Sequence, residues 1–518
     1  MKGRICIFLL LFCISGCDLL DTNSSTMVTD TTAEGNVSGL NMVLTSAYKQ
    51  LYFNSEAGEA RVYAGLTGLQ MYVDLGGPDI ICTNLYGNQM VCYTYQSDKT
   101  EYTGYSDYIW YMMYRIINQV NIILDNVDRA GGDPVLKEYV KGQALAIRGL
   151  CYFHLIQNYQ QTYMIAMDKR GVLLRTSASD PVNMPFSSVS ECYHQILNDL
   201  NSAKVYLDGY ARYDKTIIDR DVVCGLLARV HLVMNDWENA LVEASEAYNG
   251  YHVLMTRDEY RNGFDDVISN NYQEVMWAVK FTDTDNLNNQ TQFNFWYNQD
   301  PVYGERAADG PIYSYLNFFA DGEYEKLFEE DEDRYQFWKR TANPDASIAG
   351  KWAYDKYKHY GDKNGMVQGN TRPEISLMRG SEMLLIMAEA SAHLNNGKAL
   401  EYLNTLQAAR GVENKTAATG DELLEAIYRE RRKELLCEGV TGIYDLLRLQ
   451  KPLIRYGETK DYKEGHYPWG LSWLSVSEDG SHAVLPSNDY RFICQIPQME
   501  MANNNAIDKK DQNPFSGQ

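Results

Sequence analysis

Two stretches of the chain carry the apolar periodicity of short, paired helices, and they constrain the fold more than any other feature. The first covers residues 226–248 and breaks at Asn235-Asp236, where Asp236 can cap the second helix. The second covers residues 382–411 and breaks at Asn395-Asn396-Gly397. Small residues alternate with large ones inside both stretches, as close packing requires in tetratricopeptide-type solenoids. The two stretches are degenerate and far apart, which excludes a regular array but predicts a mostly α-helical fold with tetratricopeptide-like helix pairs.

Local capping signals place further helix boundaries. Ser188 and Glu191 have the spacing of a capping box, in which each side chain accepts a bond from the other residue's backbone N–H. Thr419 and Glu422 repeat that spacing, so a helix is expected to begin there and to end near Gly439.

Long polar segments rich in aromatic residues separate the helical regions. Loops of this length are uncommon in a compact domain and are usually functional or disordered, and the aromatic content argues against disorder. We therefore expect irregular ligand-binding loops at residues 72–105, 281–320, 341–375 and 456–492.

The N-terminus has the organisation of an export signal. Lys2 and Arg4 precede an apolar run at residues 5–12 that is too short to span a bilayer, and small residues lead into Cys17. A cysteine directly after Ile14-Ser15-Gly16 resembles the bacterial lipobox, whose thiol is acylated. Cys17 is therefore the expected lipidation site, with two or more acyl chains giving stable membrane attachment. The alternative is an ordinary secretory signal that ends nearby.

The expected organisation follows from this N-terminus. Residues 1–16 form the signal peptide, residues 17–36 a lipidated and polar flexible tether, and residues 37–518 a single helical domain.

The net charge excludes some classes of partner. There are 69 acidic against 47 basic side chains, so the formal charge of −22 repels nucleic acid and anionic lipid surfaces. Neutral ligands are therefore the natural candidates.

The cysteines do not indicate a disulfide framework or a zinc ribbon. The seven that follow Cys17 are scattered without a Cys-x-x-Cys pair. A disulfide bond between Cys82 and Cys92 stays open.

No motif supports catalysis. The chain has no glycine-rich phosphate loop, no His-Glu-x-x-His and no Gly-x-Ser-x-Gly. The acidic run from Glu329 to Asp333 is expected to be a solvated face, because catalytic carboxylates need separations that adjacency in sequence does not establish. We expect no enzyme activity, no cofactor and no metal site.

Four blocks together resemble the SusD/RagB family of outer-membrane lipoproteins from Bacteroidota. They carry an early Ala-x-Arg helix, an Arg-x-x-Glu helix pair, a Glu-Arg-Arg-x-Glu-Leu helix and a closing Gln-Asn-Pro segment, in that order. The blocks lie at residues 141–159, 377–411, 423–449 and 493–514. The chain departs from the family pattern at residues 441–444 and at Phe515-Ser516.

The charged residues of the Glu-Arg-Arg motif are predicted to have a structural role. Glu430, Arg431 and Arg432 lie on a helix with an apolar stripe, so they are expected to form a structural ionic network and not a catalytic group.

The resemblance implies a scaffold of four helix pairs and a partner, a SusC-type TonB-dependent transporter over which the lipoprotein sits as a lid. It also implies a lipid-anchored position in the outer membrane, facing the cell surface, where the loops capture nutrient, most simply an oligosaccharide.

Sugar capture needs an aromatic ring for the apolar face of the sugar and polar groups for its hydroxyls. Two loop segments have this composition. The candidate ligand-binding residues are Trp296, Tyr297, Asn298 and Tyr303 in one segment and Tyr86, Asn88 and Tyr95 in the other. The alternative is that these rings fasten the loops to the scaffold.

Two other functions stay open. A RagB-like peptide-binding lid would use loop backbone and pockets in place of ring platforms, and a tetratricopeptide-type adaptor would bind other proteins.

Overall fold

The structure is a computed structural model that describes most of the chain from Glu34 onward. The described residues are 34–52, 65–82, 93–95, 100–101, 104–264, 266–282, 318–340, 352–354, 356, 374–412, 418–459, 465–472 and 474–515. They are mostly helical, as the periodicity predicts.

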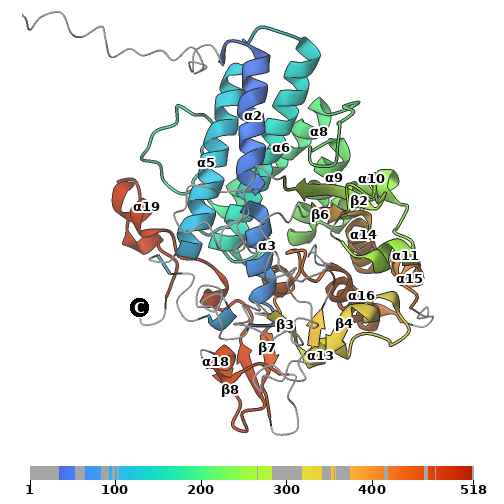
Figure 1. Ribbon diagram of the computed structural model, residues 1–518. Coiled ribbons are helices and arrows are strands. Elements are labelled where there is room, and N and C mark those ends of the chain that lie inside the picture. Colours follow the sequence, from blue (N-terminus) through green and yellow to red (C-terminus); the bar gives the residue numbers. More distant parts are fainter. Residues whose placement is uncertain are drawn as a thin grey trace, which may run out of the picture.

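Long helices build one part of the molecule and shorter elements the other (Figure 1). The helices are α2 (Val37–Tyr52), α3 (Gly65–Leu75), α5 (Gly104–Asn126), α6 (Pro134–Tyr159), α7 (Tyr163–Ala166), α8 (Val189–Tyr206), α9 (Arg220–Val233), α10 (Trp237–Tyr251), α11 (Arg257–Asn262), α13 (Gly322–Glu325), α14 (Gly380–Leu394), α15 (Ala399–Ala409), α16 (Gly420–Leu435), α17 (Gly442–Arg448), α18 (Pro468–Leu471) and α19 (Gln498–Asn503). The strands are β1 (Ile80–Cys82), β2 (Val275–Lys280), β3 (Phe318–Ala320), β4 (Trp338–Arg340), β5 (Trp352–Tyr354), β6 (Glu374–Arg379), β7 (Leu453–Tyr456), β8 (Ser475–Val476) and β9 (His482–Leu485).

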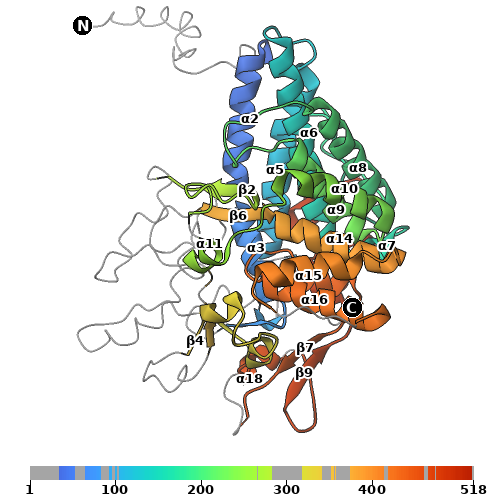
Figure 2. The ribbon, with the colours of Figure 1, turned by 90° about the vertical axis from the view of Figure 1, so that its right-hand side faces the viewer.

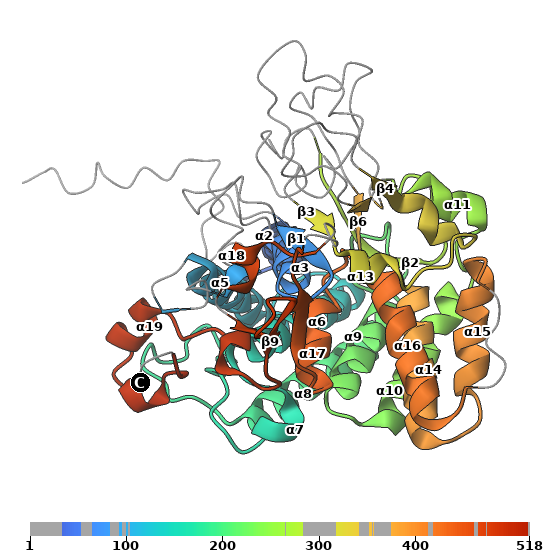
Figure 3. The same ribbon diagram turned by 90° about the horizontal axis from the view of Figure 1, so that it is seen from below.

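The scaffold consists of helices that pack on their successive neighbours. Helix α5 packs on α6, α6 on α8, α9 on α10, α10 on α14, and α14 on α15 and α16 (Figures 2 and 3). One apolar core runs through these contacts from α2 to α14. The scaffold is of the tetratricopeptide-like helix-pair type.

Both predicted helix pairs are confirmed. Residues 226–248 fall in α9 and α10, and the Asp236 carboxylate accepts from the Asn239 N–H at 3.4 Å. Residues 382–411 fall in α14 and α15, and Asn395 ends the first of these helices in the left-handed conformation with φ 52°. The capping box of Ser188 and Glu191 at the start of α8 is also present.

The predicted start of α16 is confirmed, because Thr419 is its N-cap residue, although the Thr419 side chain makes no capping bond. The predicted end is wrong, because the helix ends at Leu435, four residues before Gly439. The reason lies in tertiary contacts, because the buried Lys356 ammonium donates to the carbonyls of Glu434 and Leu436 at 2.9 and 3.0 Å. These bonds replace the helix continuation that the sequence pattern indicates.

Three sheets complete the described structure. A four-stranded sheet has the order β1-β3-β5-β4, a two-stranded sheet pairs β2 with β6, and a three-stranded sheet has the order β7-β9-β8. The neighbouring strands in these three sheets are all antiparallel. A second apolar cluster lies beneath β7 and β9 and includes Leu453, Leu485 and Phe492.

Candidate ligand-binding face

Most of the candidate ligand-binding residues lie outside the described residues. These are Trp296, Tyr297, Asn298, Tyr303, Tyr86 and Asn88, and Cys17 lies outside as well. Their attachment points on the scaffold are described, and these points relate the two candidate segments to each other.

The two candidate segments join the same edge of the four-stranded sheet. Cys82, the last residue of β1, is the cross-strand partner of Phe318, the first residue of β3. Residues 83–92 follow Cys82 and residues 283–317 lead to Phe318. Opposite residues in antiparallel strands lie about 5 Å apart, so the two segments meet the scaffold side by side.

A second pair of strand ends fixes the other limit of the longer segment. Lys280 ends β2 and pairs with Glu374, which begins β6, and their side chains form an ion pair at 2.5 Å. The Glu374 carboxylate also accepts from the backbone N–H groups of Ile268 and Ser269, both at 2.7 Å. Burial opposes the charge of Glu374, but the Lys280 and Ser269 donors outweigh it, so the pKa of Glu374 lies below its usual range.

Tyr95 takes a different position from the one expected of a ligand platform. Its side chain is 4% exposed, and its hydroxyl donates to the Gly76 carbonyl at 2.6 Å. The ring meets Phe492 edge to face with centroids 6.0 Å apart. In this structure Tyr95 fastens its segment to the scaffold, which is the alternative that the sequence left open for these rings.

Arg455 and His466, which sequence reasoning missed, hold the end of the segment at residues 83–92. The fully buried Arg455 guanidinium donates to the Leu75 carbonyl at 2.9 Å and lies 4.3 Å from the centroid of the Tyr93 ring. The Tyr93 hydroxyl and His466 Nδ1 are 2.5 Å apart, and His466 Nε2 lies 2.9 Å from the Pro78 carbonyl oxygen. Both ends of the segment are therefore attached to the scaffold. The pairing of Cys82 with Phe318 holds the residue before it, and Arg455 and His466 hold Tyr93 after it.

A buried ionic network lies behind these attachment points. Arg379 pairs with Glu274 at 2.5 Å, with Glu434 at 2.8 Å and with Glu438 at 2.6 Å. Burial opposes the charge of Glu434, but Arg410 and the neighbouring arginines outweigh it, so the pKa of Glu434 lies well below its usual range. The network connects the residue before β2 with the last residue of β6 and with the C-terminal end of α16.

The structural role predicted for the Glu-Arg-Arg motif is confirmed. Glu430 pairs with the buried Arg334 at 2.6 Å, Arg431 with Asp445 at 2.9 Å, and Arg432 with Asp79. All three side chains of the motif are thus held in ion pairs within the scaffold.

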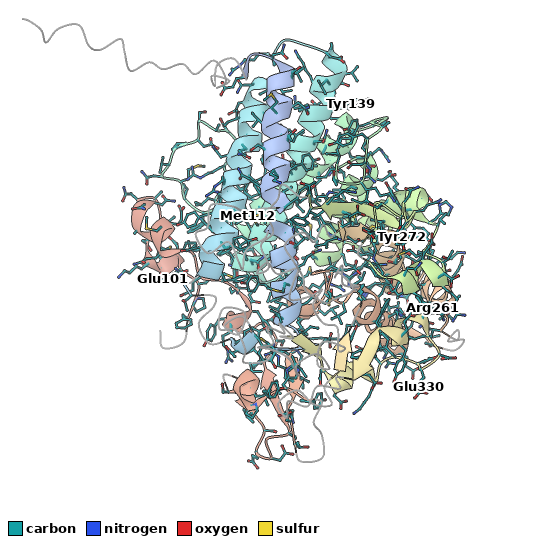
Figure 4. The ribbon with its side chains drawn as sticks, in the orientation of Figure 1. Glu101, Met112, Tyr139, Arg261, Tyr272 and Glu330 are labelled. Atoms are coloured by element: carbon teal, nitrogen blue, oxygen red, sulfur yellow. The ribbon has the colours of Figure 1, made fainter. Side chains whose placement is uncertain are left out.

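The acidic run at residues 329–333 is only partly the solvated face that was predicted. Glu330 and Asp331 are exposed, and Glu330 lies at the surface on the same side of the molecule as Arg261 (Figure 4). Glu332 and Asp333 are buried, because Lys433 pairs with Glu332 at 2.5 Å and Arg261 with Asp333 at 2.6 Å.

One group of possible metal ligands occurs within the described part of the chain. A sulfur of Cys224 and oxygens of Glu243 and Glu246 lie within 4.8 Å of one another. Lys204 pairs with both carboxylates, at 2.8 and 3.0 Å, so a cation already occupies the place of a metal. Among the described helices, none combines the length and apolar character needed to cross a membrane.

These features define a structural class: a protein with a tetratricopeptide-like helical scaffold in which two long segments connect to adjacent strand ends of one sheet. Residues 280–515 match the model of the SusD family, and residues 23–232 match a model described as "Starch-binding associating with outer membrane". Together the two models cover most of the chain. The chain belongs to the SusD/RagB family.

Individual relatives agree with this assignment. A crystal structure of a SusD-like carbohydrate binding protein from Bacteroides vulgatus has a TM-score of 0.77 and 28% identity, covering 93% of this chain and 99% of that one. A SusD superfamily structure from Bacteroides thetaiotaomicron has a TM-score of 0.72 and 22% identity over 93% of this chain and 100% of that one, which shows the shared fold. A SusD-like protein of Formosa agariphila is 25% identical over 53% of this chain and 50% of its own length. A second one is 23% identical over 79% of this chain and 84% of its own length.

Proposed function

We propose that this protein is a cell-surface lipoprotein that binds a neutral oligosaccharide and serves as the lid of a SusC-type TonB-dependent transporter. Family membership supports a carbohydrate ligand and an association with the outer membrane, as one matching model is described in those words. The B. vulgatus relative described as carbohydrate binding supports the same ligand class. Lipidation at Cys17 provides the anchor in this proposal, and the loops face the cell exterior.

The pairing of Cys82 with Phe318 is the observation that carries the binding proposal. It joins the segment with Tyr86 and Asn88 to the same sheet edge as the segment with Trp296 and Tyr303. Rings from one segment would stack on the sugar face, while amides from either segment would bind its hydroxyls.

The proposed role is capture without turnover. Several buried carboxylates of the described part are held in ion pairs, as Glu274, Glu434 and Glu438 are with Arg379. Asp74 is also buried but accepts hydrogen bonds from the Gly439 N–H and the Thr441 hydroxyl instead, and burial raises its pKa to about 8. In the proposal the helical scaffold contacts the transporter barrel, and transport work is done by that partner. Co-purification of the transporter with the tagged lipoprotein from outer membranes tests the partnership.

A combined glycan and peptide array, probed with the soluble mature domain, tests the ligand class. We expect binding to a family of neutral glycans, and the bound oligosaccharide should keep its chain length on prolonged incubation. Binding to the peptides alone would replace this proposal with the RagB-like peptide lid. Turnover that persists through purification and disappears when a carboxylate is mutated would overturn the binding-protein proposal.

Protease treatment of intact cells tests the surface position against the adaptor alternative. A surface lid is digested from outside, whereas a periplasmic tetratricopeptide adaptor is left intact.

A further inference from the structure

A cleft on the outer flank of α5 lies apart from the sheet edge that carries the candidate loops. It has a volume of about 480 Å³ and is formed by one face of α5 and by residues 175–182. We propose that this cleft is a second binding site for a short neutral oligosaccharide.

The α5 side of the cleft offers a ring and an amide. Tyr111 and Asn118 both line it and are seven residues apart, so they share one helix face two turns from each other. The Tyr111 side chain is 37% exposed, and Asn118 is exposed as well. Neither side chain has a hydrogen-bond partner within the described residues, so both are available to a ligand. A partly exposed tyrosine ring and an amide on the same face, about 10 Å apart along the helix, can contact different parts of one oligosaccharide, the ring stacking on a sugar and the amide binding hydroxyls.

The opposite wall is held in place before any ligand arrives. Arg175 donates to the carbonyls of Pro181 and Val182, both at 2.7 Å. Asp180 accepts from the backbone N–H groups of Thr176 and Ser177 at 2.6 and 3.0 Å. Arg175 and Asp180 therefore direct these hydrogen bonds to the wall itself. Arg115 of α5 also lines the cleft and has an interaction of its own, so the polar groups around the cleft suit a neutral ligand.

The floor is fixed by a buried ion pair. Arg148 pairs with Asp199 at 2.7 Å and donates through Nη1 to Asn121 Oδ1 and to the Thr176 carbonyl, both at 2.9 Å. Asn121 in turn donates to the Arg175 carbonyl at 3.0 Å. These bonds connect the two walls through the floor, so the cleft is formed before a ligand binds. Binding then requires little further ordering of the protein, which lowers its entropic cost. The volume of the cleft also falls within the roughly 300 to 1,000 Å³ of small-molecule sites.

The second site is inferred from the contacts of the cleft itself. It shares only the class of ligand with the loop site of the proposed function. The test measures amide hydrogen exchange of the mature protein with and without maltohexaose, laminarihexaose, xylohexaose and mannohexaose. Each sugar is used at about 10 mM, which is tenfold above a millimolar dissociation constant. Exchange at residues 174–183 should slow by up to about tenfold with at least one of them, because ligand suppresses local opening in proportion to its occupancy.

Variants separate the cleft from other sites. Tyr111→Ala should remove the protection at residues 174–183, and Tyr111→Phe should keep it because the ring remains. Tyr213→Ala is the matched control, since it removes a tyrosine that is 80% exposed and does not line the cleft. If Tyr111→Ala fails to fold, Asn118→Ala takes its place with an expected weakening of several-fold.

Each outcome decides between the two proposals. Protection confined to segments that join β1, β2 and β3 overturns the second site and leaves the proposed function standing. Protection confined to residues 174–183 supports the second site and contradicts the loop site. Protection at neither place with any of the four sugars, or protection of the cleft by a peptide pool instead, overturns the second site.

Discussion

Trp237 and His393 stack face to face, with ring centroids 3.9 Å apart and an angle of 9° between the ring planes. Trp237 begins α10 and His393 lies in the last turn of α14, so the stack joins the two helix pairs that the sequence predicted separately.

Trp237→Ala should lower the free energy of unfolding by about 1 to 2 kcal/mol. The ring is only partly buried, so its loss removes the stacking and a fraction of the apolar burial, less than the cost for a fully buried tryptophan. Urea unfolding of the two proteins measures the difference. Equal stability would mean that the stack does not hold the helix pairs together.

His154 makes stability depend on pH. Burial, assisted by Arg229, lowers the pKa of His154 to about 3, and its Nδ1 has no hydrogen-bond partner within the described residues. In the unfolded chain a histidine takes up a proton near pH 6.5. Between these two values the unfolded state binds more protons, so stability falls by about 1.4 kcal/mol per pH unit as the pH drops below about 6.5.

His154→Phe should therefore reduce the loss of stability between pH 7 and pH 5 by about 2 kcal/mol relative to the wild type. His231 and His393 also have lowered pKa values, but they are present in both proteins and cancel in the comparison. Denaturant unfolding at the two pH values checks this. Parallel losses in the two proteins would show that His154 titrates normally in the folded state.

Glu434→Gln should destabilise the protein by about 3 to 5 kcal/mol. The change keeps the shape of the side chain but leaves Arg334, Arg379 and Arg410 with one fewer buried carboxylate. Glu401→Gln is the matched control, because the pair of Glu401 with Lys398 is on the surface and should contribute almost nothing. Similar unfolding midpoints for the two variants would contradict the role given to the network.

Cys17→Ala should abolish labelling with palmitate and release the protein from the membrane fraction. Cys17 is the proposed acylation site, and loss of the acyl chains removes the anchor. Metabolic labelling followed by fractionation measures both effects. Residual membrane attachment could come from the transporter partner, but continued acyl labelling would rule out the assignment of Cys17.

The helices were predictable because their signals are local. Asp236 caps α10 and Ser188 caps α8 through bonds that span only three residues, so the sequence contains the whole interaction. The end of α16 was not predictable in this way, since Lys356 is distant in sequence from the Glu434 and Leu436 carbonyls that it binds. Cys437 shows the same limit: it belongs to an apolar helical pattern but lies beyond the helix end, with φ 65°.

The strands and the loop anchors were also hidden from sequence reasoning. Strand β1 has three residues, and its pairing with β3 joins positions more than two hundred residues apart. In β7, Arg455 is fully buried while its neighbour Tyr456 is 43% exposed, which reverses the usual polarity of a half-buried strand. The charge of Arg455 is accepted inside because backbone carbonyls from α3 and its following turn receive its bonds.

Trp296→Ala tests whether the segment at residues 283–317 carries the proposed sugar platform. Titration calorimetry should compare the wild type, Trp296→Ala and Trp237→Ala, using the oligosaccharide that the array selects. Loss of a central ring commonly costs about 2 kcal/mol at a binding hot spot, roughly thirtyfold in affinity. We predict that Trp296→Ala nearly abolishes binding with an unchanged melting temperature, whereas Trp237→Ala melts earlier and binds normally. Wild-type affinity in a Trp296→Ala protein that melts early would contradict the account, because Trp296 would then be a loop anchor and not the sugar platform.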